Sequence, residues 1–336
     1  MSLRRLSFVA AVMLVAASLS TGTAGAVGKA AAPQAPQAAP AAAPAAAVPT
    51  TTKVVRYGPF TLPGNPTGTH EERGLLAEIA ANEFAFDIPR PCDDCFITGI
   101  QPDFTYPDGT NANVDTGPMM HHIVLNHALK LDVTCAFWPQ TLVGKRIFAS
   151  GNERTGRTLP AGYGYRVNKG DRWNMIYDLM TMSPDEKTVY IEITYTIADS
   201  NSGLKPLTPF WMDAGGCLLP YYDVPAGENV KTWDWTSSIS GKLIAIGGHV
   251  HHGGHSVKLT NATTGQLYCD SVARSGETPE FIDMHGNKEI SSMTTCLGDP
   301  VATINKGDRL RISAKYVSDH GHKNVMGIMI GWLAEE

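Results

Sequence analysis

The sequence predicts an all-β protein composed of two tandem antiparallel β-sandwich domains. Its 336 residues include 33 Gly and 22 Pro, a composition typical of many turns that join short strands. Hydrophobic residues make up 43% of the chain and charged residues only 18%, which excludes a disordered protein. At roughly 150 residues per domain, the length corresponds to about two domains that can each bury a hydrophobic core.

The N-terminal segment predicts export. Residues 1–26 combine a basic start, an apolar stretch over 8–19 and an A-x-A arrangement ending at Ala26, which indicates a Sec-type signal peptide. Residues 27–52 are almost wholly Ala, Pro and Gln and predict a disordered linker, because a Pro recurs every few residues and disfavours a helix. No later segment reaches about 18 uninterrupted apolar residues, so we expect a secreted or extracytoplasmic protein without a transmembrane segment.

Past the linker, the hydrophobic pattern predicts one helical segment, over residues 71–86. The other elements are short strands separated by turns rich in Pro, Asp, Asn and Gly. Strands are expected at 53–62, 120–129, 163–167, 173–180, 189–197, 242–250, 256–259, 301–304, 309–316 and 325–333. A polar stretch at 199–207 divides the core into an N-terminal sandwich (53–203) and a C-terminal sandwich (204–336) of similar size.

The net charge limits the expected binding partners, and the cysteine content indicates which cysteines form disulfides. The net charge of −5 gives no reason to expect nucleic acid or an anionic membrane as a partner. Six cysteines in an exported chain are expected to form disulfides, with Cys269 and Cys296 as the best candidate pair. The Cys92-x-x-Cys95 motif is compatible with redox chemistry or zinc, but a structural disulfide is favoured because no second C-x-x-C and no thioredoxin-like pattern accompany it.

The histidines are clustered: nine of the eleven lie in three short segments. In the segment 247–255, His249 and His251 are two residues apart, so on a strand they project to the same face and can chelate one ion. His252 would lie on the opposite face, as an outer or surface group. The alternative is a surface strand with ordinary histidines. Imidazole is a common ligand of transition metals, so we favour a metal site.

The last histidine cluster, at 319–326, ends in Met326. A methionine at the head of a strand is more often part of the core. Its thioether is nevertheless a soft ligand that suits Cu(I), and a His-His-Met set indicates copper rather than zinc.

In the first half, His121 and His122 are adjacent. In a regular strand they would point to opposite faces, one into the core and one outward, with no metal between them. Both can reach one ion only at a bulge or at a strand end.

With these motifs the chain resembles the copper type II, ascorbate-dependent monooxygenases, the family of peptidylglycine α-hydroxylating monooxygenase and dopamine β-monooxygenase. Residues 120–125 (Met-His-His-Ile-Val-Leu) resemble the family's His-His-Met-Leu-Leu strand, and 159–164 its Leu-Pro-x-Gly-x-Gly turn. Residues 249–254 resemble its His-x-His-His-x-Gly motif, 306–310 its Gly-Asp-x-Leu motif, and Met326 its copper-binding methionine.

The resemblance implies two jelly-roll-like sandwiches that face each other across a solvent cleft, with one copper on each. It implies a catalytic copper at His249, His251 and Met326, where O2 would be activated, and an electron-transfer copper that includes His121 and His122. The metals would carry the redox chemistry while the protein sets ligation and access.

The chain departs from the family pattern at the electron-transfer copper. The strand 173–180 lacks the expected third histidine, and Asp178 is the best substitute, although a carboxylate is a poorer Cu(I) ligand than imidazole. His127 is a second candidate.

A second departure concerns the substrate. The positions that hold the substrate carboxylate in the peptide hydroxylases are Gly247, Ile328 and Ile330 here, and none of these can bind an anion. A small neutral or apolar substrate is therefore favoured over a glycine-extended peptide.

The sequence thus predicts a secreted copper-dependent monooxygenase that uses O2, a small-molecule substrate, one or two copper ions and an external reductant such as ascorbate. The alternative is an extracytoplasmic copper carrier that has lost turnover. A zinc or structural metal site is a third possibility, which Met326 disfavours.

Overall fold

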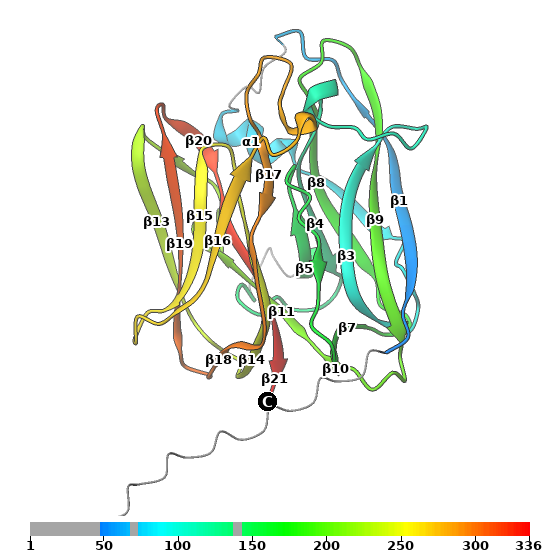
Figure 1. The fold of residues 1–336 in the computed structure, drawn as a ribbon, viewed down its shortest axis with the longest axis vertical. Coiled ribbons are helices and arrows are strands. Elements are labelled where there is room, and N and C mark those ends of the chain that lie inside the picture. Colours follow the sequence, from blue (N-terminus) through cyan, green and yellow to red (C-terminus); the bar gives the residue numbers. More distant parts are fainter. Residues whose placement is uncertain (1–47, 68–72, 137–142) are drawn as a thin grey trace, which may run out of the picture. The chain divides into compact units, whose positions relative to one another are not determined.

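The computed structural model describes residues 48–67, 73–136 and 143–336, which form an all-β unit (Figure 1). The all-β prediction is confirmed. The predicted signal peptide and residues 27–47 of the predicted linker lie outside the described residues, and Thr51 already begins strand β1. Within the described residues, no helix is both long enough and apolar enough to cross a membrane.

The strands up to residue 206 form two sheets. One has the order β1-β9-β3-β7-β10 with β6 beside β3, and only its β10–β7 pair is parallel; the other has the antiparallel order β2-β8-β4-β5. The bounds are β1 Thr51–Leu62, β2 Glu83–Ile88, β3 Cys95–Thr105, β4 Pro118–His127, β5 Lys145–Ser150, β6 Arg157–Thr158, β7 Tyr163–Val167, β8 Trp173–Thr181, β9 Lys187–Asp199 and β10 Lys205–Pro206. The predicted domain boundary between 203 and 204 stays a prediction.

The later strands form two further sheets and a two-stranded ribbon. The sheets have the orders β11-β21-β14-β18 and β13-β19-β15-β16-β17, and the ribbon pairs β12 with β20. The bounds are β11 Thr208–Asp213, β12 Tyr222–Val224, β13 Gly227–Thr236, β14 Gly241–Val250, β15 Gly254–Asn261, β16 Leu267–Ser275, β17 Ile290–Met293, β18 Thr295–Ile304, β19 Arg309–Ser318, β20 His322–Val325 and β21 Gly327–Glu335. Short 3₁₀ turns lie at Val114–Thr116 and Pro279–Phe281.

The expected pair of separate sandwiches facing each other across a cleft is wrong. The four principal sheets have a four-bladed, propeller-like arrangement, in which Figure 1 shows the sheet of β13 and β19 and the sheet of β1 and β9 on opposite sides. Of the two large apolar cores, one contains Ile123 of β4 together with Ile328 and Trp332 of β21 and so spans both halves, while the other contains residues between 210 and 333 only. Strand β21 explains why there is a shared core where a solvent cleft was expected. It is buried from Gly327 to Ala334, and therefore on both of its faces.

The predicted helix over 71–86 is too long. Its first two residues lie outside the described residues, α1 covers Leu75–Ala81, and Glu83–Ile88 forms β2, paired with β8. The sequence Glu-Phe-Ala-Phe-Asp-Ile repeats its apolar residues with the period of a strand.

Three disulfides are present. Cys269–Cys296 is confirmed, and Cys92–Cys95 is a disulfide as favoured from the sequence. Cys135–Cys217 connects the two halves of the chain. Three disulfides are consistent with an extracellular protein.

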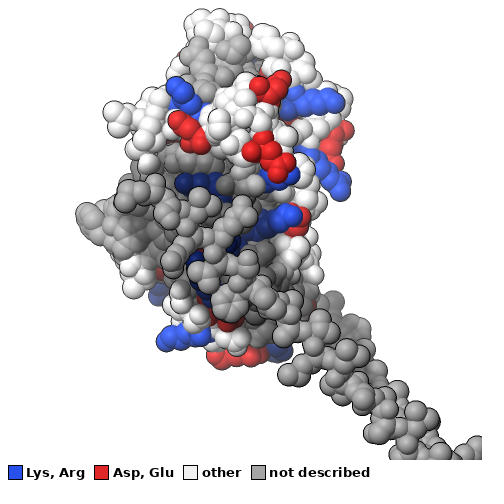
Figure 2. All heavy atoms as spheres, turned by 90° about the vertical axis from the view of Figure 1, so that its left-hand side faces the viewer, with Lys and Arg blue, Asp and Glu red and all other residues white. Residues whose placement is uncertain are grey.

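Surface charges of both signs are intermingled. On the face shown in Figure 2, Lys and Arg side chains lie beside Asp and Glu. Between β13 and β19, Arg311 pairs with Asp234 at 2.7 Å and Lys315 with Glu228 at 2.9 Å. Exposed pairs of this kind contribute little to stability, so the interior charges are more informative about chemistry.

Candidate metal centre

The two predicted histidine pairs meet in one cluster. His121 and His122 lie on β4, while His249 lies on β14 and His251 directly follows that strand. The ring centroids are 5.0 Å apart for His121 and His122, 4.6 Å for His121 and His251, and 5.3 Å for His249 and His251. Residues expected at two separate sites are therefore neighbours, brought together by contact between the halves.

A β-bulge makes the first pair possible. The register of β4 against β8 shifts between Met120 and His122, so Met120 opposes Leu179 while His122 opposes Asp178. The bulge that the sequence analysis required for a shared site is present. His121 and His122 are both buried, each 6% exposed.

The spacing of the rings fits metal binding. One ligand atom from each of His121, His122 and His251 lies within 4.8 Å of the other two. Because a metal–imidazole bond is about 2 Å long, two rings that share an ion have centroids roughly 4.5 to 6.3 Å apart. All three ring distances in the cluster fall in this range.

Asp178, the predicted substitute ligand, orients His121 in this structure. Its Oδ2 atom lies 2.9 Å from His121 Nδ1 and 2.5 Å from the guanidinium of Arg73. Burial alone would raise the pKa of Asp178, but the hydrogen bonds of His121 and Arg73 hold it well below the usual range. An ionised carboxylate only accepts hydrogen bonds, so His121 donates through Nδ1 and carries its lone pair on Nε2. Glu78 lies near the same nitrogen, at 3.7 Å.

Asn82, the residue that ends α1, sets the tautomer of His122. Its amide nitrogen donates to the carbonyl of Glu78 at 2.9 Å and contacts the Tyr221 hydroxyl at 2.8 Å. Its oxygen therefore faces His122, whose Nε2 donates to it at 2.7 Å. The lone pair of His122 is thus on Nδ1. Burial lowers the pKa of His122 to about 3, which keeps the ring in the neutral form that binds metals.

Glu153 sets the tautomer of His249, as Asn82 does for His122. It is buried between β5 and β6, and its Oε1 atom lies 3.0 Å from His249 Nδ1 and accepts from the Gly151 amide at 2.9 Å. Burial would raise the pKa of Glu153, but the hydrogen bonds from His249 and the Gly151 amide lower it. His249 therefore donates through Nδ1 and presents Nε2.

Two of these nitrogens are suited to an ion. In the part of the chain that the structure describes, His122 Nδ1 and His249 Nε2 are buried and have no hydrogen-bond partner. A buried polar atom without a partner is costly, and a metal ion would satisfy it. The residues present thus fit a metal held by imidazoles.

His127, the other predicted ligand, is not in the cluster. It lies at the far end of β4, where Nδ1 contacts the Tyr165 hydroxyl at 2.9 Å and Nε2 contacts Asp171 at 3.1 Å. Both ring nitrogens are engaged, so His127 is a structural residue here.

Tyr316 links the second histidine pair to Met326. Its buried hydroxyl accepts from the backbone N–H of His251 at 2.9 Å and donates to the backbone carbonyl of Met326. The Met326 side chain lies in the same apolar cavity as His122 and His249.

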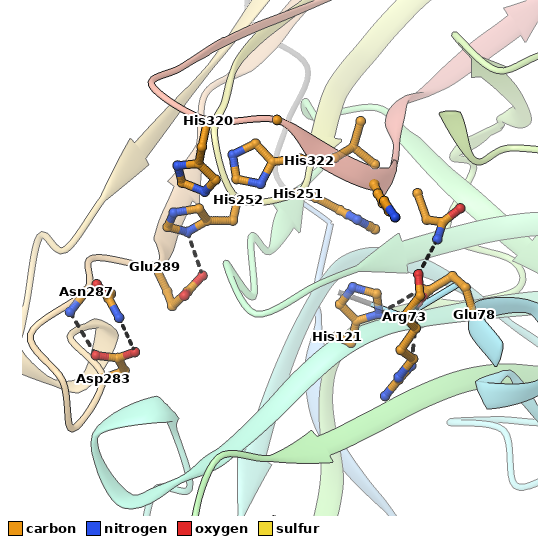
Figure 3. A pocket seen from close by; sticks show the side chains of 14 residues that line it. Arg73, Glu78, His121, His251, His252, Asp283, Asn287, Glu289, His320 and His322 are labelled. Atoms are coloured by element: carbon orange, nitrogen blue, oxygen red, sulfur yellow. Dashed lines mark hydrogen bonds and ion pairs between the residues drawn. The ribbon is translucent and has the colours of Figure 1, made fainter. Parts of the chain in front are cut away.

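The histidine cluster separates two cavities of different character. A polar cavity of about 320 Å³ reaches His121 and His251 and is shown in Figure 3. An apolar cavity of about 130 Å³ lies on the side of His122, His249 and Met326. We call these the polar cavity and the apolar chamber.

The apolar chamber offers no free cation. Among its described lining residues the one cation is Arg146, whose guanidinium contacts both carboxylate oxygens of Asp132 at 2.9 Å. Of the three positions predicted to lack an anion clamp, Ile328 lines the chamber and Ile330 is buried in the core. At Gly247, the space that a Cβ would need is occupied by the guanidinium of Arg157.

Sequence reasoning missed the orienting residues Asn82, Glu153 and Arg73. Asn82 ends a helix, and the other two lie in irregular segments, so no periodicity marked them.

Comparison with known proteins supports copper chemistry in relatives. The chain is 26% identical over 303 residues to probable copper-dependent oxygenase M1 of Phoma sp., covering 84% of this chain and 72% of that protein. It is 27% identical over 252 residues to probable copper-dependent oxygenase clz3 of Cochliobolus lunatus, covering 68% and 76%. Residues 222–336 match the family described as Stress up-regulated Nod 19.

A solved structure of peptide-N(4)-(N-acetyl-β-D-glucosaminyl) asparagine amidase covers 85% of this chain and 97% of its own, with 9% identity and a TM-score of 0.39. The sequence relatives support a likeness to copper-dependent oxygenases in general, and not to the ascorbate-dependent monooxygenases in particular.

Proposed function

We propose that this protein is a copper-dependent oxygenase whose metal centre is assembled from both halves of the chain. The observation that carries the proposal is the cluster of His121, His122 and His251, with ligand atoms within 4.8 Å of one another. The names of two distant relatives support copper and oxygen chemistry. Bound copper supplies the one-electron redox steps by which O2 is activated.

In this proposal the predicted ligands have different roles in copper binding. His121, His122 and His251 hold copper between the halves, while His249 and Met326 approach it from the apolar chamber. A thioether beside imidazoles favours Cu(I) over zinc. Asp178 orients His121 and is not itself a ligand in this proposal.

The chamber favours a small neutral or apolar substrate. A carboxylate that entered it would lose hydration without gaining a cation, because Arg146 is already paired with Asp132. A chamber beside the histidines also favours the oxygenase over a copper carrier, which needs no substrate cavity.

Hydroxylation requires an external reductant. One oxygen atom of O2 enters the C–H bond and the other leaves as water, which consumes two electrons and two protons per turnover. We propose a small polar donor such as ascorbate, which the polar cavity can admit.

The test is to measure copper content and O2 consumption of the purified protein with ascorbate, with and without neutral apolar compounds. We expect bound copper and O2 consumption that rises with apolar compounds but not with glycine-extended peptides. A His255→Gln variant serves as the control, because His255 is exposed and lines neither cavity. Bound copper without O2 consumption would support the carrier, and absence of copper binding would exclude both functions.

A further inference from the structure

A second group of imidazoles lies at the outer end of the polar cavity. His252 follows β14, and His320 and His322 lie at the connection between β19 and β20. The ring centroids of His320 and His322 are 4.4 Å apart, and those of His252 and His322 are 5.7 Å apart. Figure 3 shows these three rings grouped together, with His121 and Glu78 farther along the same cavity.

The outer rings differ in exposure. The side chain of His320 is 63% exposed and that of His252 is 37% exposed, whereas His322 is buried, as His121 is. His320 and His252 can therefore meet a dissolved ion before the buried His121 does.

Carboxylates orient two of the outer rings. Asp319 lies 2.6 Å from His320 Nδ1, and Glu289, which is itself buried, lies 3.3 Å from His252 Nδ1. Carboxylate–histidine pairs fix the ring and make its other nitrogen a better metal ligand. His121 and His249 of the inner cluster show the same pairing.

The polar cavity joins the outer group to the inner cluster. His251 and His252 are neighbours in the sequence and both line it, and the ring of His251 is 4.6 Å from that of His121. Glu78, Asp283 and Glu289 place carboxylates along the cavity. Of its two lining cations, Arg73 is bound to Asp178 and Lys323 is exposed.

We propose that His252, His320 and His322, with Glu289, form a second copper site that captures the ion and passes it through the polar cavity to the inner cluster. This inference rests on the proposed function, since it assumes that the inner cluster binds copper. Transfer requires only ligand exchange: each new metal–imidazole bond replaces an old one, and no electron or proton is consumed.

The experiment measures uptake of Cu(I) from a coloured chelate by the full metal-free chain. The parent is compared with the double variant His252→Gln/His320→Gln and with the control His255→Gln. Both altered positions are partly or largely exposed, so the fold should be retained, and circular dichroism checks this. For the double variant we expect loading of the inner site to slow by at least about tenfold, because two ligands of the outer site are removed, and one weakly bound equivalent to be lost. The final affinity of the inner site should be unchanged.

Each outcome has a distinct meaning. Equal loading rates and stoichiometry in parent and double variant would exclude the capture site and leave the proposed function intact. An outer site that retains Zn²⁺ against excess Cu(I) would be a structural metal site and would also exclude it. A parent chain that takes up no Cu(I) would exclude the proposed function and the capture site together.

Discussion

The two histidine pairs reach the same cluster by different means. The pair on β4 is oriented within its own half, by Asp178 and Asn82. The pair on β14 depends on the other half, because Glu153 orients His249 from the loop between β5 and β6. If the halves separated, the first pair would keep its orienting groups and the second would not. Contact between the halves is therefore a condition for the complete centre.

The largest effect is expected from opening the disulfide between the halves. The bond Cys135–Cys217 spans 82 residues, and the chain-entropy estimate for such a loop is about 4.5 kcal/mol of unfolding free energy. The variant Cys135→Ser/Cys217→Ser should lose about this much in chemical denaturation.

The matched control is Cys92→Ser/Cys95→Ser. That bond spans three residues, so the same estimate gives about 1.6 kcal/mol. Equal losses in the two double variants would show that the longer disulfide does not stabilise the contact between the halves.

The second-largest effect is expected when a metal ligand is removed from either histidine pair. We expect His122→Ala and His249→Ala each to lower Cu(I) affinity by more than about 100-fold, above the range for an outer partner. Because the pairs share one cluster, both variants should weaken the same ion in a competition titration. If each variant instead removed one of two independent ions, the two histidine pairs would form separate metal sites, which would contradict a single shared cluster.

The carboxylates Glu153 and Asp178 test whether the orientation of each histidine pair depends on contact between the halves. Glu153→Gln and Asp178→Asn should each weaken copper binding by about 10- to 100-fold. In the Cys135→Ser/Cys217→Ser background, the effect of Glu153→Gln should shrink, because the contact between the halves that aligns Glu153 with His249 is weaker there. The effect of Asp178→Asn should stay the same; a parallel decrease would contradict the proposed independence of the first pair.

The smallest effect is expected at Tyr316. Its hydroxyl joins the backbone of His251 to that of Met326, so Tyr316→Phe should cost about 1 kcal/mol of stability. Tyr222→Phe is the matched control, since among the described residues its buried hydroxyl has no hydrogen-bond partner. Thermal unfolding of the two variants measures the difference, and an equal shift would show that the Tyr316 hydroxyl has no special role.

The local parts of the site could be predicted from the sequence. The two-residue spacing of His249 and His251 and the adjacency of His121 and His122 are properties of short segments, and strand geometry converts them directly into positions. The same holds for Cys269–Cys296, which closes a short stretch of strands.

Features that depend on contact between the halves could not be predicted in this way. Glu153 and Asn82 reach the histidines only after distant segments pack together. The core shared by both halves was missed because a solvent cleft was assumed from the family resemblance. The sequence of 327–334 nevertheless indicates a strand that is buried on both faces, because apolar residues occupy successive positions and do not alternate with polar ones.

Strand β21 also determines when the centre can form during synthesis. It lies between β11 and β14 in its sheet and contributes to the core shared by both halves, yet every other described strand precedes it in the sequence. A ribosome releases the histidines of β4 and β14 before it releases this strand. The nascent chain therefore carries all four histidines before the core shared by both halves is complete, and we expect the two pairs to meet only after translation has passed residue 335.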